Sequence, residues 1–82
     1  MSFLYEDDGY EVVVVVPGLG SSKTSVERYV VAEKDPEKAR HIVELLISVG
    51  QTVDYVSAVP KNAMITYRLA PGKVWKGLIL SA

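Results

Sequence analysis

Basic and aromatic side chains alternate along the last third of this 82-residue sequence. Residues 51–82 carry four cations and the single acid Asp54, whereas the whole chain has a net charge of −1. This combination is typical of surfaces that bind single-stranded nucleic acid, because aromatic rings stack on bases while cations contact phosphates. A pI of about 5.7 is low for a dedicated nucleic-acid binder, so Tyr67 and Trp75 are also candidates for core or interface anchors. The candidate contact residues for nucleic acid or a protein partner are Tyr55, Lys61, Tyr67, Arg68, Lys73, Trp75 and Lys76.

Residues that could perform catalysis or hold a metal are scarce. The sequence has no cysteine and a single histidine, His41, which excludes disulfides and the common zinc sites. No serine has an identifiable base partner for nucleophilic catalysis. The adjacent acids Glu6, Asp7 and Asp8 are expected to diverge at a solvated turn, whereas calcium loops alternate their ligands so that they converge. We therefore predict no catalytic residue, no metal ligand and no cofactor.

Residues 17–24 invite comparison with a phosphate-binding loop. They read Pro-Gly-Leu-Gly-Ser-Ser-Lys-Thr and follow a strongly apolar run. A P-loop requires glycine immediately before the lysine and a second glycine five positions earlier, because the backbone amides there curl around phosphate. Ser22 and Pro17 occupy these two positions. The stretch therefore predicts a surface loop.

Fourteen valines indicate a sheet, because β-branched side chains fit pleated strands better than helices. The pair Asp8-Gly9 favours a two-residue hairpin turn. Residues 12–16 are all valine and show no alternation, which is typical of a strand that is covered on both faces. The predicted strands span residues 3–5, 10–16, 24–32, 52–59, 63–70 and 74–80.

One helix is predicted between Asp35 and Gly50. Asp35 is a favourable N-cap, Pro36 suits the first helical position, and Gly50 is a typical stop. Apolar residues recur from Ala39 to Val49 at the spacing of one buried face, and Leu45 and Ile47 widen this face to an arc of about 200°. An arc this wide indicates more than one packing neighbour.

These elements predict a single α+β domain over residues 1–82. Its expected order is β-β-β-α-β-β-β, an antiparallel sheet of five to six strands with one helix packed on one face. Because one helix covers only one face, we expect the opposite face to meet a second copy of the chain, with a dimer favoured. The candidate self-association residues are Val12, Val14, Val16, Leu45 and Ile47.

The first half of the chain also carries a recognisable order of motifs. Residues 5–10 read Tyr-Glu-Asp-Asp-Gly-Tyr, residues 14–20 read Val-Val-Val-Pro-Gly-Leu-Gly, and residues 35–39 read Asp-Pro-Glu-Lys-Ala. In this order, residues 1–50 resemble the HicB-type antitoxin domain. The resemblance implies a stand-alone antitoxin-like module that neutralises a small RNA-cleaving toxin. It does not extend to operator binding, because no DNA-binding segment follows.

The sequence as a whole predicts a non-catalytic binding module that self-associates through its sheet and binds a protein or nucleic-acid partner. The longest apolar run, residues 12–16, is far shorter than the roughly 20 residues of a membrane-spanning helix, so no membrane contact is expected. The N-terminus lacks a secretory signal, which predicts a cytoplasmic location. Few amides and no cysteine favour a heat-adapted source.

Overall fold

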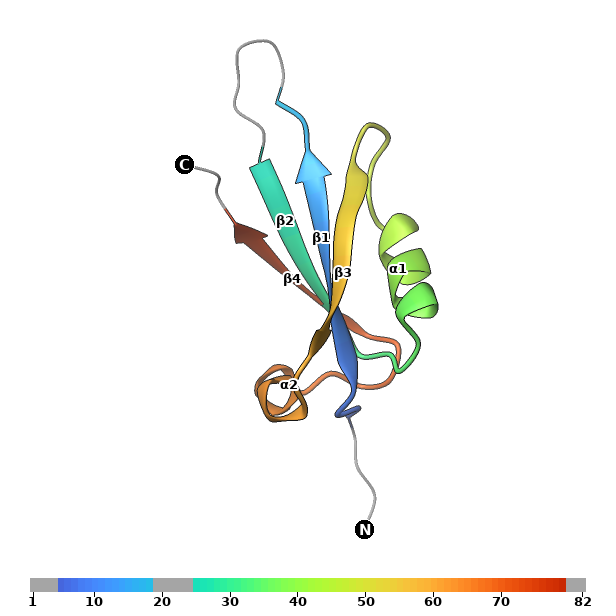
Figure 1. Ribbon diagram of the computed structural model, residues 1–82, viewed down its shortest axis with the longest axis vertical. Coiled ribbons are helices and arrows are strands. Elements are labelled where there is room, and N and C mark those ends of the chain that lie inside the picture. Colours follow the sequence, from blue (N-terminus) through green and yellow to red (C-terminus); the bar gives the residue numbers. More distant parts are fainter. Residues whose placement is uncertain (1–4, 19–24, 80–82) are drawn as a thin grey trace.

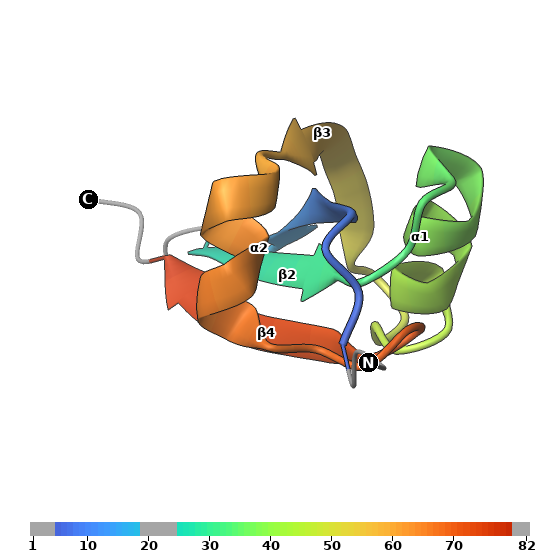
Figure 2. The same ribbon diagram turned by 90° about the horizontal axis from the view of Figure 1, so that it is seen from below.

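In the computed structural model, which describes residues 5–18 and 25–79, four antiparallel strands form one sheet with a short helix on each side (Figure 1). Seen from below, the sheet separates the two helices (Figure 2). The spatial order of the strands is β3-β1-β2-β4. Along the chain the elements are β1 (Gly9–Val16), β2 (Ser25–Val31), α1 (Pro36–Glu44), β3 (Thr52–Val59), α2 (Lys61–Tyr67) and β4 (Val74–Ile79).

The strand register assigns each side chain to one of two faces, because paired residues on neighbouring strands point the same way. On the first face, Val12 is paired with Tyr29 and Val56, and Tyr29 with Lys76. We call this the α1 face. On the second, which we call the aromatic face, one row runs from Tyr55 through Val13 and Arg28 to Gly77, and the next includes Glu11, Val30 and Trp75.

Helix α1 covers the α1 face and encloses the larger part of the core. Asp35 caps the helix by accepting a hydrogen bond from the backbone N–H of Glu37 at 2.9 Å. Ala39 and Val43, one turn apart on the helix, have no exposed surface. They pack with Val12, Val14, Tyr29 and Val31 of the sheet. The predicted cap and the buried face of the helix are confirmed at these positions.

Helix α2 covers only one end of the aromatic face. Its anchor is Met64, which is fully buried against Val30 and Ala32. Gly9 makes this contact possible, because a Cβ at residue 9 would overlap the Met64 side chain and lie 2.9 Å from the carbonyl oxygen of Val31. Thus the glycine that was predicted for a turn has another role. It begins β1 and makes room for a side chain of α2.

The predicted sheet of five to six strands is wrong, as is the single helix. The described residues contain four strands, and the segment predicted as a strand over residues 63–70 instead overlaps α2, which begins at Lys61 and ends at Tyr67. Ile65, Thr66 and Tyr67 favour a strand locally, but burial of Met64 holds the turn in a helix. The predicted strand over residues 3–5 falls mostly outside the described residues, and Tyr5 itself is not in a strand.

The predicted helix is also too long at its C-terminal end. Helix α1 ends at Glu44, and the following turn closes on the carbonyl of Val43 through the N–H groups of Leu46 and Ile47. Gly50 lies beyond it at a φ of 93°. Because the helix stops early, Leu45, Leu46 and Val49 are 72%, 56% and 105% exposed. The wide apolar arc of the sequence therefore becomes an exposed apolar turn, and only its first half is core.

Neither helix of the described residues has the length and apolar character that crossing a lipid bilayer requires.

Candidate functional site: the aromatic face

The part of the aromatic face that α2 leaves uncovered is the candidate site. One row of side chains crosses all four strands there, from Tyr55 on β3 through Val13 and Arg28 to Gly77 on β4. The indole of Trp75 extends over Gly77, because a Cβ at residue 77 would approach Cζ3 of the ring to 2.7 Å. Tyr55 and Trp75 therefore lie on the two edge strands of one face, with Arg28 and the buried side chain of Val13, which is only 4% exposed, between them.

Arg28 occupies the centre of this surface. Its guanidinium carbon is 5.7 Å from the ring centre of Trp75 and 6.0 Å from that of Tyr67. The two rings are 5.0 Å apart and tilted by 57°. The Arg28 guanidinium also forms an ion pair with the carboxylate of Glu11 from the neighbouring strand. The positive charge is thus compensated within the surface, and the cation–π contacts hold the rings in place.

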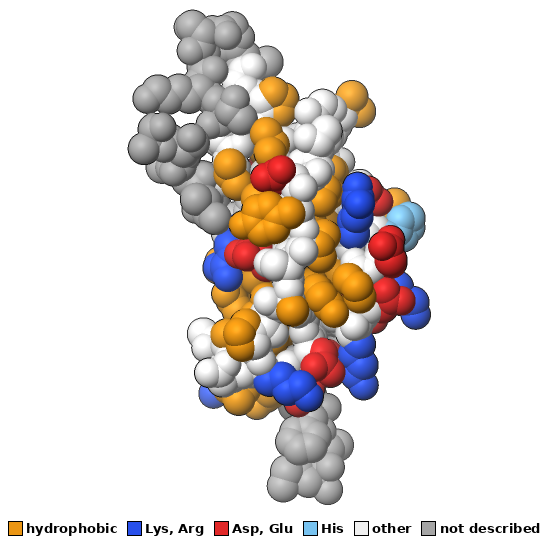
Figure 3. All heavy atoms as spheres, viewed as in Figure 1, with side chains coloured by type: hydrophobic (Ala, Val, Ile, Leu, Met, Phe, Trp, Pro, Cys, Tyr) orange, Lys and Arg blue, Asp and Glu red, His pale blue; other side chains and the backbone are white. Residues whose placement is uncertain are grey.

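The surface combines exposed aromatic rings with few free charges. Tyr55 is 51% exposed and Trp75 is 37% exposed. Val15 and Val26, paired in the next row towards the end of the sheet, are half-buried. In Figure 3 hydrophobic side chains run down the middle of the molecule with a few charged side chains among them, and further charged side chains lie on the side of α1 and at the lower end. Exposed apolar surface of this kind marks contact sites when it is contiguous.

The structure brings together only part of the predicted contact set. Tyr55, Tyr67 and Trp75 belong to the aromatic face, with Tyr67 on α2. Lys76 lies on the other face, where its ammonium is 3.3 Å from Glu27.

The other three cations of the set are dispersed. Lys61 pairs with Asp8 at 3.6 Å, and Lys73 lies beside α1-face residues. Arg68 ends α2 in the left-handed conformation, with a φ of 51°. Of the predicted cations, Lys73 and Lys76 therefore lie on the α1 side and not on the aromatic face.

The predicted self-association residues lie on the α1 side of the molecule. Val12 and Val14 are fully buried beneath α1 within a single chain, so they offer no surface to a second copy. Val16 and Ile47 are half-buried against the same core. Leu45 alone of the five is strongly exposed. The exposed rings of Tyr55 and Trp75 on the aromatic face therefore offer more apolar contact surface to a second copy than the predicted sheet residues do.

Sequence reasoning missed Glu11, Arg28 and Gly77. Arg28 and Gly77 are 49 positions apart in the chain, and only the pairing of β2 with β4 makes them neighbours. The available signal was the alternation in residues 25–31, which places Arg28 and Val30 on one face. The identity of the neighbouring strands could not be read from it.

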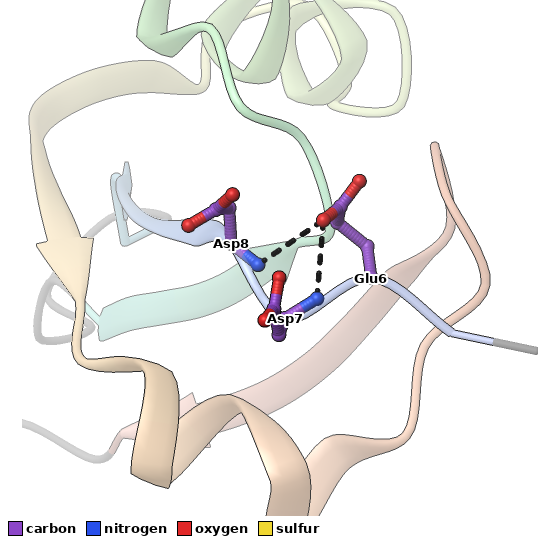
Figure 4. A group of neighbouring side chains, drawn as sticks. All are labelled: Glu6, Asp7 and Asp8. Carbon is purple, nitrogen blue, oxygen red and sulfur yellow. Dashed lines mark hydrogen bonds between the residues drawn. The ribbon is translucent and has the colours of Figure 1, made fainter. Parts of the chain in front are cut away.

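The acidic group at Glu6, Asp7 and Asp8 forms a tight turn before β1 (Figure 4). One carboxylate oxygen of Glu6 accepts hydrogen bonds from the backbone N–H groups of Asp7 and Asp8, at 3.2 and 3.4 Å. One carboxylate oxygen from each residue lies within 4.8 Å of the others, so the expectation that these side chains diverge is wrong. Because Glu6 bonds its own turn and Asp8 pairs with Lys61, the group is explained by local structure.

Comparison with protein-family models, with curated proteins and with solved structures finds no match for this chain. The resemblance of residues 1–50 to the HicB-type domain therefore stays a prediction.

Proposed function

We propose that this chain is a non-catalytic binding module whose aromatic face pairs with a second copy of the chain. The observation that carries the proposal is the pair of exposed rings, Tyr55 and Trp75, on the two edge strands of the aromatic face, with the ion pair of Arg28 and Glu11 between them. Burial of aromatic rings provides the favourable free energy of association. The pairing of Arg28 with Glu11 lowers the cost of bringing this charge into an interface, since neither ion is left without a partner.

The size of the face predicts a weak complex. Four strands about 4.8 Å apart and about six residues long present roughly 400 Å² in projection. A standard interface buries about 800 Å² per partner. An interface of this size is at the weak, transient end of protein–protein contacts, so we expect association in the micromolar range or weaker, which analytical ultracentrifugation can measure.

Sedimentation equilibrium with two matched variants tests the proposal. The wild-type chain should approach twice 9.0 kDa as its concentration rises through the micromolar range. Tyr55→Glu should remain at the mass of one chain, because it places an unpaired charge in the interface. Leu45→Glu, at a still more exposed apolar position on the α1 side, should dimerise as the wild type does. Dissociation by Leu45→Glu but not by Tyr55→Glu would refute the choice of face.

Binding of single-stranded nucleic acid is a second candidate. Three aromatic side chains on one side of the sheet, with an arginine among them, support stacking on bases. The compensation of Arg28 by Glu11 and the position of Lys76 on the other face weigh against contact with phosphates. Trp75 is the single tryptophan, so its fluorescence reports directly on this candidate. Quenching by an oligonucleotide that weakens as salt rises would favour it, and no response would exclude it.

A further inference from the structure

A groove on the α1 face, between α1 and β4, is separate from the aromatic face. Helix α1 packs on β1, β2 and β3, which leaves the β4 side of this face uncovered. The space there is a cavity of about 500 Å³, open to solvent. Its lining includes Tyr29, Ile42, Leu46, Lys73, Val74 and Lys76.

The floor and one wall of the groove are apolar. Ile42 of α1 and Val74 of β4 both pack against the main core and are half-buried. Leu46 lies in the turn that follows α1 and is 56% exposed. The early end of α1 thus leaves a leucine beside the groove without full cover. An aliphatic chain lying along these three side chains would remove apolar surface from water.

The polar part of the groove is positively charged. Glu27 is already occupied, because it accepts a hydrogen bond from the Tyr29 hydroxyl at 3.0 Å and pairs with Lys76 at 3.3 Å. The ammonium of Lys76 has three donors, so others remain for a ligand. Among residues 5–18 and 25–79, no carboxylate lies within ion-pair distance of Lys73. One cation of the groove is thus uncompensated within the described chain.

The protonation states of Lys76 and Tyr29 are consistent with a positively charged groove. A lysine with the ordinary pKa is already charged at neutral pH, and the hydrogen bond to Glu27 raises the pKa of Lys76 further. Burial, and then the hydrogen bond to Glu27, raises the pKa of Tyr29, so its hydroxyl remains a donor to Glu27. The backbone of Lys73 is fixed, since its N–H bonds Ala70 and its carbonyl accepts from Ala32. The Lys73 side chain therefore extends from a fixed backbone position at the edge of the groove.

We propose that this groove binds an amphiphilic anion, with an aliphatic chain along Ile42, Leu46 and Val74 and a carboxylate at Lys73 and Lys76. Free aliphatic carboxylates of medium length are the ligand class that these side chains fit. The site lies on the opposite side of the sheet from Tyr55 and Trp75, so it does not depend on the proposed self-association.

Nuclear magnetic resonance of the full chain tests this site with dodecanoate as the probe. Backbone amide shifts should concentrate at Tyr29, Ile42, Leu46 and Val74, and the Trp75 indole N–H should not move. Dodecyltrimethylammonium, which has the same chain length and the opposite charge, should bind more weakly. Equal binding of the two amphiphiles, or shifts centred on Trp75, would overturn the proposal.

Two variants with a matched control complete the test. Lys73→Glu should weaken dodecanoate binding about fivefold, in line with the modest energies of exposed ion pairs. Leu46→Ala should also weaken it, because it removes apolar contact from an exposed position that the fold does not need. Lys34→Glu makes the same charge change at an exposed lysine that does not line the groove and should leave binding unchanged. An unchanged affinity in Lys73→Glu would overturn the assignment of the carboxylate position.

Discussion

Truncation of Met64 should reveal how α2 is held on the sheet. Met64 is fully buried against Val30 and Ala32, and it is the one buried residue of α2. Met→Ala changes at such sites lower the free energy of unfolding by about 2–5 kcal/mol, and the small cluster here favours about 3 kcal/mol. Ile65→Ala is the control, since Ile65 is 54% exposed on the same helix and should cost less than about 0.5 kcal/mol.

Gly9 makes this prediction sharper, because its missing Cβ provides the space for Met64. Gly9→Ala alone should cost about 2 kcal/mol through overpacking. In the double variant with Met64→Ala the overlap with the methionine is gone, so the loss should be smaller than the sum by about 1 kcal/mol. The remaining cost reflects the approach of the new Cβ to the Val31 carbonyl, at 2.9 Å.

Urea denaturation at a protein concentration below dimer dissociation measures all four variants without a contribution from association. Two results would refute the reasoning. One is a loss for Met64→Ala no larger than that for Ile65→Ala. The other is strict additivity in the double variant, which would mean that Gly9 and Met64 do not share the same space.

Three further predictions concern a helix cap, a backbone conformation and pH. Asp35→Ala should lower the free energy of unfolding by about 1 kcal/mol, because the Glu37 N–H loses its acceptor; an unchanged urea midpoint would contradict the cap. Arg68→Gly should raise the free energy of unfolding by up to about 1 kcal/mol, because φ at residue 68 is 51° and glycine adopts this conformation without strain. A loss of stability measured by thermal unfolding would contradict this prediction. The folded-state pKa of Tyr29 is raised above its ordinary value of 10.0, so its contribution to stability is fully present below pH 10 and is lost as pH rises through the folded pKa. Absorbance titration should show one of the five tyrosines ionising late, and Tyr29→Phe should remove that phase.

The sequence was most informative where local chemistry decides the structure. Asp35 and Pro36 begin α1 as expected, and residues 12–14 are buried on both sides of the sheet. These features depend on side chains that lie close together in the chain. The α+β class and antiparallel sheet follow from them.

The features of the fold and the site that the sequence did not predict depend on contacts between segments that are distant in the chain. Residues 61–67 form a helix because Met64 finds a site on β2 that Gly9 leaves open, and neither fact is visible in the local pattern. The candidate site was predicted only through Tyr55, Tyr67 and Trp75. The split of the lysines between two faces follows from the register of β2 with β4, in which Lys76 is paired with Tyr29.

The central claim is that the aromatic face, and not the α1 side, joins two copies of the chain. A dilution series followed by nuclear magnetic resonance tests it most directly on the unmodified protein. Self-association predicts concentration-dependent shifts at the Trp75 indole N–H and at the amides around Tyr55 and Val13, with little change along α1. Spectra that do not change with concentration, or changes confined to Leu45 and its neighbours, would contradict the claim.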